Sequence, residues 1–169
     1  MGRTFVGTSA NYCEVYVDLE ASRAATQLRE NPGLLELIKE ALPQIELVGP
    51  DVTKEHDFGK VIGFTDLVEV GDGDEIVYAV RENREVYTKF AKDREPSECN
   101  WVTMVFRAVA DGYMLYTTWI GQISPPFPGE PTATHESWAF WRIHALVYGR
   151  QAIKPGTETT VCPDTTNPW

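Results

Sequence analysis

The sequence is poor in cysteine and histidine and has no long hydrophobic run. Its 169 residues include three histidines and only three cysteines, Cys13, Cys99 and Cys162. An odd and scattered set of cysteines predicts neither a disulfide framework nor a paired-cysteine zinc site. The longest apolar stretches fall far short of the roughly 18 residues that a membrane-spanning helix needs. Because the N-terminus also lacks a signal-peptide pattern, we expect a cytoplasmic protein that does not enter a membrane.

The motifs of common cofactor and metal sites are absent as well. Gly71-Asp72-Gly73 has neither the third glycine nor the helix of a dinucleotide-binding turn. His135 and the following glutamate do not begin a zinc-protease motif, because Phe140 stands near the place of the second histidine. No serine has the context of a nucleophile elbow. We therefore expect no cofactor and no metal, and no covalent catalysis.

Basic residues are outnumbered by acidic ones. The chain has 15 lysines and arginines against 25 acidic residues, a formal net charge of −10. Such a charge argues against broad attraction to nucleic acid or to an anionic membrane, so a phosphate site has to be local. The stretch from Arg81 to Arg94 is the one candidate, since five basic residues there face three acidic ones. The alternative is a solvated charged face.

The order of hydrophobic patterns predicts an α+β fold, in which N-terminal helices pack on an antiparallel β-sheet meander and a further helix follows. We expect a single domain over residues 1–150 and a loosely attached Thr/Pro-rich tail over residues 151–169. The expected segments are a helix over 18–30 capped by Asp18, a helix from Asn31-Pro32 to Pro43, a polar loop over 54–57, a short strand over 76–80, a hairpin of 101–109 and 113–120, a Pro-rich loop over 124–131, and a helix from Thr132 or Thr134 to about Tyr148.

Two histidines are candidates for metal-free acid–base chemistry on a phosphate. His56 stands in the expected polar loop before a strand, from which a side chain reaches a cleft. His144 follows Phe140 and Trp141 at helical spacing, so it is either an acid or a core histidine bonded through one nitrogen. An exposed loop histidine is the alternative for His56.

Arginine and threonine side chains supply the other candidates. Arg81 and Arg84 follow the strand over 76–80, and arginine grips phosphate in a fixed plane. Ion pairs with neighbouring glutamates are the alternative. Thr117 and Thr118 lie in the second strand of the hairpin, where one hydroxyl reaches a sheet face unless β propensity alone explains both residues. The five tryptophans and the tyrosines Tyr78, Tyr87 and Tyr116 either stack on bases or belong to the core.

Several of these segments together resemble known proteins. The resemblance is to the barnase/EndoU/RelE-like ribonuclease superfamily of prophage and polymorphic toxins, and the later segments look like an uncharacterised bacterial family of about this length. It covers roughly residues 50–150 and rests on the runs His56-Asp57-Phe58-Gly59-Lys60-Val61-Ile62-Gly63, Asp74-Glu75-Ile76-Val77-Tyr78-Ala79 with the two arginines, Tyr116-Thr117-Thr118-Trp119-Ile120-Gly121, Phe127-Pro128-Gly129, Glu136-Ser137 and Phe140-Trp141-Arg142-Ile143-His144-Ala145-Leu146-Val147.

The resemblance implies a site on the face of an antiparallel sheet that packs on the N-terminal helices. In such a site His56 matches the histidine before the first sheet strand, Arg81 and Arg84 the central basic positions, and Thr117 or Thr118 the late hydroxyl. The implied reaction is metal-independent cleavage of RNA, in which the ribose 2′-OH attacks the phosphate and leaves a 2′,3′-cyclic phosphate. His56 would be the base and His144 the acid.

A non-enzymatic function is the alternative to this RNA-cleaving hydrolase. The acidic chain could be a binding module for a protein partner, using the aromatic and Pro-rich surface from Trp119 to Pro131. The candidate partners are thus RNA for the toxin-like enzyme and a protein for the binding module. Convergence of His56, Arg81 and a strand threonine in one cleft would favour catalysis.

Overall fold

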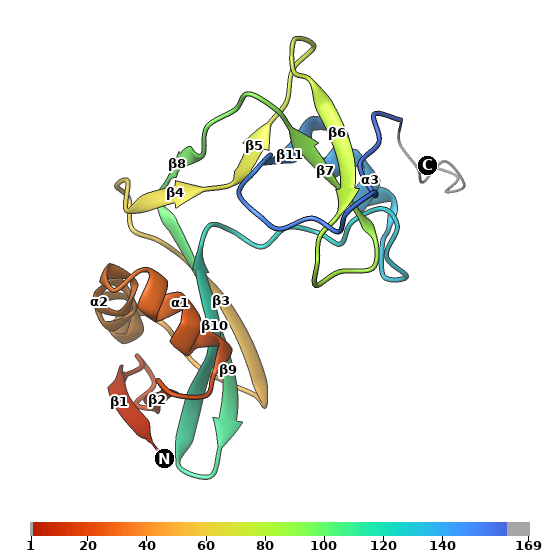
Figure 1. Cartoon of the computed structure of the whole chain (residues 1–169). Coiled ribbons are helices and arrows are strands. Elements are labelled where there is room, and N and C mark those ends of the chain that lie inside the picture. The colour runs from red at the N-terminus through yellow and green to blue at the C-terminus, as the bar shows by residue number, and fades with distance from the viewer. Residues whose placement is uncertain (1, 162–169) are drawn as a thin grey trace. The chain divides into compact units, whose positions relative to one another are not determined.

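The computed structural model describes residues 2–161, which form an α+β fold, as the sequence predicts (Figure 1). Contacts within the chain divide it into two compact units. The first unit holds the residues up to 63 together with residues 99–123. The second holds residues 64–98 and, within the described residues, 124–161. The single domain over residues 1–150 stays a prediction from the sequence.

The first unit is built on a five-stranded sheet with the order β1-β2-β10-β9-β3. Its centre is the antiparallel β9–β10 hairpin that the sequence predicts. β10 also pairs with β2 in parallel over two residues, which joins the N-terminal hairpin to the rest of the sheet. The strands are β1 (Arg3–Thr8), β2 (Glu14–Asp18), β3 (Asp51–Asp57), β9 (Trp101–Val109) and β10 (Gly112–Ile120).

Two α-helices follow β2, and both begin later than the sequence analysis expects. α1 spans Arg23–Glu30 and is capped by Ser22, whose hydroxyl accepts from the backbone N–H of Ala25 at 3.0 Å. The expected cap, Asp18, ends β2 instead, and its carboxylate accepts from two backbone N–H groups of the turn before the helix. α2 spans Gly33–Ala41 and runs into the short 3-10 helix η1 (Leu42–Gln44).

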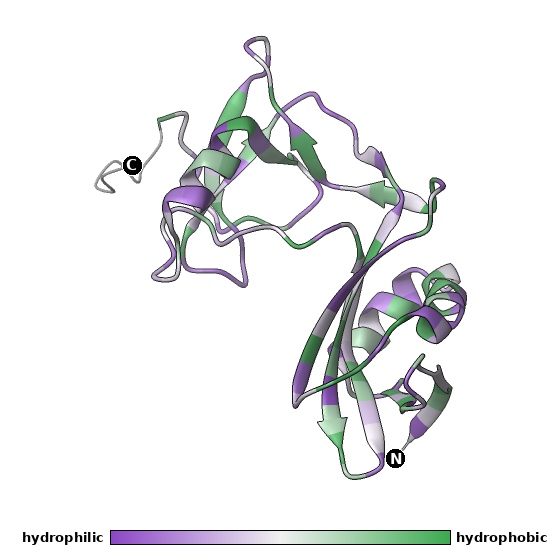
Figure 2. Ribbon diagram, turned by 180° about the vertical axis from the view of Figure 1, so that it is seen from behind, coloured by the Kyte–Doolittle hydropathy of each residue, from purple (hydrophilic) through white to green (hydrophobic). Residues whose placement is uncertain are grey.

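The core of the first unit lies between these helices and the sheet. Side chains alternate along β9, so that Val102, Met104 and Phe106 are buried on one face. They join Ile38 and Leu42 in one cluster of apolar side chains. Figure 2 shows the alternation as green and purple segments along the long strands. Burial of each large side chain stabilises the unit by about 1.5–3 kcal/mol.

The second unit contains a four-stranded sheet with the order β5-β11-β7-β6 and the helix α3. β4 and β8 form a separate two-stranded sheet where the chain passes from one unit to the other. The bounds are β4 (Gly63–Thr65), β5 (Leu67–Glu69), β6 (Ile76–Val80), β7 (Tyr87–Ala91), β8 (Ser97–Cys99), α3 (His135–Ile143) and β11 (His144–Val147).

The C-terminal helix is shorter than the sequence predicts, and this part of the prediction is wrong. α3 begins after Thr134, one of the two expected caps, but it ends at Ile143. Residues 144–147 form β11, which pairs with β5 antiparallel and with β7 in parallel. Ala145 and Val147 are buried at a spacing of two residues. Pairing on both sides therefore outweighs the helical spacing of the aromatic residues before it.

Two further predictions about the order of elements are wrong. Residues 54–57 lie in β3 and are not a loop, and His56 is paired with Val102. β3 is an edge strand of its sheet, and charged side chains are common on such strands because one edge faces solvent. The helices do not lead the chain either, since β1 and β2 precede them. Period-two patterns this short are hard to tell from turns in a sequence.

The expected tail begins as an ordered segment. Tyr78 of β6 exchanges two backbone hydrogen bonds with Thr159, at 2.7 and 2.8 Å. The backbone N–H of Lys154 donates to the carbonyl of Val80, and that of Glu82 donates to Ala152. The segment over 152–159 thus lies along the outer edge of β6. The rest of the expected tail, residues 162–169 with Cys162, lies outside the described residues.

Replacement of Gly112 tests the join between β10 and β2. Gly112 has a φ of +151°, and a Cβ there would overlap the carbonyl oxygen of Glu14. We expect Gly112→Ala to lower the free energy of unfolding by about 2 kcal/mol, measured by urea denaturation. Gly33→Ala is the matched control, because its Cβ would meet only ordinary contacts at a helix start. Equal stability of the two variants would contradict the close approach.

Candidate functional site

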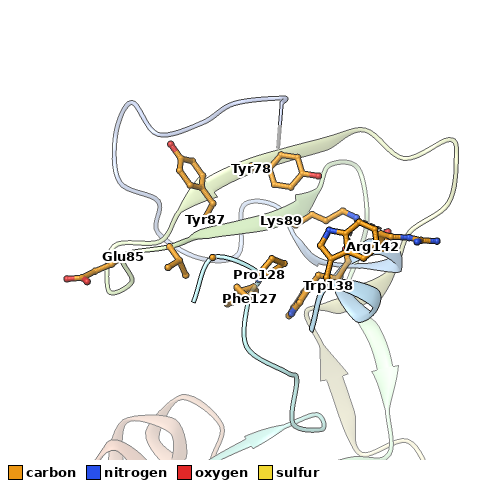
Figure 3. Close-up of a pocket in the computed structure, with 11 residues that line it drawn as sticks. Tyr78, Glu85, Tyr87, Lys89, Phe127, Pro128, Trp138 and Arg142 are labelled. Carbon is orange, nitrogen blue, oxygen red and sulfur yellow. Dashed lines mark hydrogen bonds between the residues drawn. The ribbon is translucent and has the colours of Figure 1, made fainter. Parts of the chain in front are cut away.

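The second unit contains a pocket of about 470 Å³ (Figure 3). A pocket of a few hundred Å³ is large enough for a small ligand or a short peptide segment. Three parts of the unit supply its walls: the β6–β7 hairpin, the Pro-rich loop and α3. The lining residues are Tyr78, Glu85, Val86, Tyr87, Lys89, Phe127, Pro128, Gly129, Trp138, Trp141 and Arg142.

The pairing of β6 with β7 explains why their polar and aromatic side chains face the pocket. Tyr78 lies opposite Lys89 in the antiparallel pair, so both side chains project from one face of the hairpin. Val77 and Phe90 lie opposite each other on the other face and are buried in the core. Tyr87 is two residues before Lys89 and shares its face. Figure 3 shows Tyr78 and Tyr87 on the side of the pocket opposite Phe127 and Pro128.

Lys89 joins the hairpin to the helix. Its Nζ donates to the backbone carbonyls of Trp141 at 2.9 Å and Arg142 at 3.0 Å. Both carbonyls lie in the last turn of α3, where carbonyl groups have no partner within the helix and carry partial negative charge. The ammonium group therefore satisfies the helix end and fixes α3 against β7.

Trp141 holds the Pro-rich loop on the inner side of the pocket. Its ring is 4% exposed, and its indole N–H donates to the carbonyl of Pro125 at 3.1 Å. The ring of Phe127 lies 4.6 Å from the Trp141 ring, centroid to centroid. The guanidinium of Arg81 lies 5.2 Å from the centre of the Phe127 ring. These contacts order a loop that has no regular secondary structure of its own.

Trp138 is placed one helical turn before Trp141 and is half-buried in the pocket wall. The guanidinium of Arg142 lies 5.0 Å from the centre of its ring. Within residues 2–161 the indole N–H of Trp138 has no hydrogen-bond acceptor, and Arg142 has no carboxylate partner. The pocket therefore presents an aromatic surface together with an unused donor and an unpaired cation.

Three of the predicted site residues lie in the first unit and have local partners there. His56 packs edge-on against Phe58, with 4.7 Å between ring centroids. The Thr117 hydroxyl donates to Gln27 of α1 at 2.9 Å. The Thr118 hydroxyl is fully buried and donates to the backbone carbonyl of Thr103 at 2.8 Å. The two threonines thus hold the helix and the strands of the sheet.

The other three predicted residues lie in the second unit. Arg81 and Arg84 are brought together by the β6–β7 turn, where the backbone N–H of Arg84 donates to the Arg81 carbonyl at 3.0 Å. Burial lowers the pKa of the Arg81 guanidinium, and the charge of Arg84 lowers it further while Glu130 opposes the shift. His144 stacks on Phe140 at 3.9 Å, and its Nδ1 lies 2.9 Å from the Phe140 carbonyl oxygen. None of the six predicted residues lines the pocket.

The residues that do line the pocket carried weaker signals in the sequence. For Tyr78 and Tyr87 the sequence predicts only rings that either stack on bases or enter the core, and for the Pro-rich loop a part of a binding surface. The spacing of three residues between Trp138 and Trp141 indicates one helix face. The pattern does not reveal that Trp141 contacts the chain's own Pro-rich loop whereas Trp138 lines the pocket.

The part of the chain that the structure describes holds no metal-binding cluster and no membrane-spanning helix. Within residues 2–161 there is no group of three histidine, cysteine or acidic side chains placed to hold a metal ion. In the same part of the chain, no helix is long and apolar enough to cross a membrane.

Thr118→Val separates a structural from a phosphate-binding role of the predicted hydroxyl. The change keeps the shape of the side chain and removes the hydrogen bond to Thr103, so we expect a loss of about 1 kcal/mol in the free energy of unfolding. Thr53→Val on the edge strand β3 of the same sheet is the control, because Thr53 is exposed and we expect no change in stability. Unchanged stability of Thr118→Val with weakened RNA binding would contradict the structural role.

Comparison with known proteins does not add to this geometry. No protein-family model matches the chain, and no curated protein or solved structure does either. The resemblance to ribonucleases that the sequence suggests thus stays a prediction. The functional conclusion has to come from the contacts of the pocket itself.

Proposed function

We propose that this protein is a non-enzymatic binding module whose ligand occupies the aromatic pocket of the second unit. The observation that carries the proposal is the set of aromatic side chains that a hairpin, a loop and a helix bring around one cavity. Aromatic rings give a large contact area at a small cost in side-chain entropy, and they are enriched where proteins bind one another. A half-buried Trp138 with an unused N–H fits this role better than a role in the core.

The charged residues around the pocket indicate which chemical groups its ligand carries. Lys89 and Arg142 line it, whereas Glu85 is its one acidic residue within residues 2–161. In Figure 3, Glu85 lies at one end and points away from the rings. The whole chain is acidic and by itself would favour a basic partner. The pocket instead favours a ligand that offers hydrogen-bond acceptors or a negative charge.

Metal-independent cleavage of RNA remains a prediction from the sequence. His56, the predicted base, and the two threonines lie in the first unit, whereas the two arginines and His144, the predicted acid, lie in the second. Both threonine hydroxyls also have protein acceptors. Binding at the aromatic pocket needs none of these groups.

Binding of the fluorescent probe 1-anilinonaphthalene-8-sulfonate tests the pocket. The probe combines flat aromatic rings with an anionic group, so we expect saturable binding at one site. Trp138→Ala and Tyr87→Ala are each expected to weaken it at least about fivefold, since one aromatic contact is worth about 1 kcal/mol beyond its area. Phe64→Ala is the matched control, because Phe64 is 61% exposed and does not line the pocket.

The proposal is wrong if Trp138→Ala and Tyr87→Ala bind the probe as tightly as the wild type does. Both variants must have a native circular dichroism spectrum for this comparison. A weaker affinity of Phe64→Ala alone would place the probe outside the pocket.

Incubation with RNA in excess EDTA tests the proposal that the protein does not cleave RNA. We expect no cleavage by the wild-type protein or by His56→Ala. Fragments with 2′,3′-cyclic phosphate ends that form with the wild type and not with His56→Ala would establish the ribonuclease instead.

A further inference from the structure

Resting on the binding function proposed above, we infer that the ligand of the aromatic pocket is a proline-rich segment of a partner protein that carries an acidic residue. The inference starts from a contact that the chain makes with itself. The chain's own segment Ser124-Pro125-Pro126-Phe127-Pro128 lies on α3, and the indole N–H of Trp141 donates to the carbonyl of Pro125. This helix thus already binds one proline-rich segment.

Trp138 repeats the chemistry of Trp141 one helical turn earlier. Residues three apart on a helix are neighbours on its surface, with about 5–6 Å between their Cβ atoms. Trp141 is buried beneath the loop and its indole N–H is used. Trp138 is half-buried, lines the pocket and has no acceptor for its indole N–H within residues 2–161. A second proline-rich segment at Trp138 would complete the same arrangement.

The polar groups of the pocket match a ligand that accepts hydrogen bonds. Trp138 supplies an N–H donor, and the hydroxyl of Tyr87 has no protein partner within the described part of the chain. Among the described residues that line the pocket, Glu85 alone has a carboxylate, and it points away from the rings (Figure 3). A proline residue has a carbonyl acceptor and no N–H to leave unpaired. Its polyproline II conformation is preformed, and aromatic grooves bind such segments at a low entropic cost.

Charge complementarity adds the acidic residue. Arg142 lies beside Trp138 and has no carboxylate partner within residues 2–161. Lys89 lies on the same side of the pocket and its ammonium bonds to the end of α3. A glutamate that follows the prolines of the ligand would meet this positive potential and form an ion pair with Arg142.

The chain's own loop supplies the probe for the test. We would titrate the full-length protein with the synthetic peptide Ser-Pro-Pro-Phe-Pro-Gly-Glu and follow the indole N–H signals by ¹H–¹⁵N NMR. We expect the Trp138 signal to shift and the peptide to displace the anilinonaphthalene probe. Trp138→Phe keeps a ring and removes the donor, so its affinity for the peptide should fall about fivefold.

Two control peptides separate the contributions of proline and of charge. The peptide Ser-Ala-Ala-Phe-Ala-Gly-Glu should bind at least about tenfold more weakly, because it lacks the preformed extended conformation. Replacing the last glutamate by glutamine should weaken binding to the wild type but not to Arg142→Gln, which is the signature of a direct ion pair.

The outcomes distinguish the ligand from the site. Equal affinity for the proline and alanine peptides, or a Trp138 signal that does not move, overturns the inference. If the fluorescent probe still binds at the pocket in that case, the binding function stands and only its ligand is wrong. Displacement of the probe by an oligoribonucleotide and not by the proline peptide overturns the inference in favour of nucleic acid. If the fluorescent probe itself does not bind at the pocket, the proposed binding function is wrong.

Discussion

The pair of hydrogen bonds from Lys89 to the end of α3 is the contact on which the pocket depends. It joins β7 to two carbonyls of the helix that would otherwise have no partner, at 2.9 and 3.0 Å. The same helix holds the Pro-rich loop through Trp141 and Pro125. Hairpin, helix and loop are thus connected in series by charged and polar bonds to backbone groups. β11 follows α3 directly and also pairs with β7, so the Lys89 bonds fix the end of a helix that the sheet already holds close to the hairpin.

The first unit shows how similar groups can serve structure alone. Gln27 of α1 accepts hydrogen bonds from both the Thr117 hydroxyl and the Thr118 backbone N–H. The bonds lie where the register of β9 and β10 shifts, at a bulge that leaves backbone groups in need of partners. A polar side chain in the middle of a strand is therefore a weak sign of catalysis. Trp138 differs, because its indole N–H has no acceptor among residues 2–161.

Much of the fold follows from patterns that are local in the sequence. Three elements agree with prediction: the β9–β10 hairpin, the strand β6 and the Pro-rich loop without regular secondary structure. They do so because alternation of apolar residues and the effect of proline extend over only a few residues. The start of α3 after Thr134 agrees for the same reason. β3 and β11 do not, since their form depends on pairing with strands far along the chain. His56 lies in a strand because β3 pairs with β9, and His144 lies in a strand because β11 pairs with β5 and β7.

The sequence by itself determined the α+β class and the lack of cofactor motifs, and it marked the aromatic, Pro-rich segment from Trp119 to Pro131 as a candidate binding surface. It could not determine which aromatic side chains form a site. Trp138 and Trp141 are the same residue three positions apart, and their difference arises because a loop more than ten residues upstream covers one of them. Lys89 lies 52 residues from the carbonyl that it bonds. Contacts over such separations are set by the packing of the whole unit, which a local pattern does not encode.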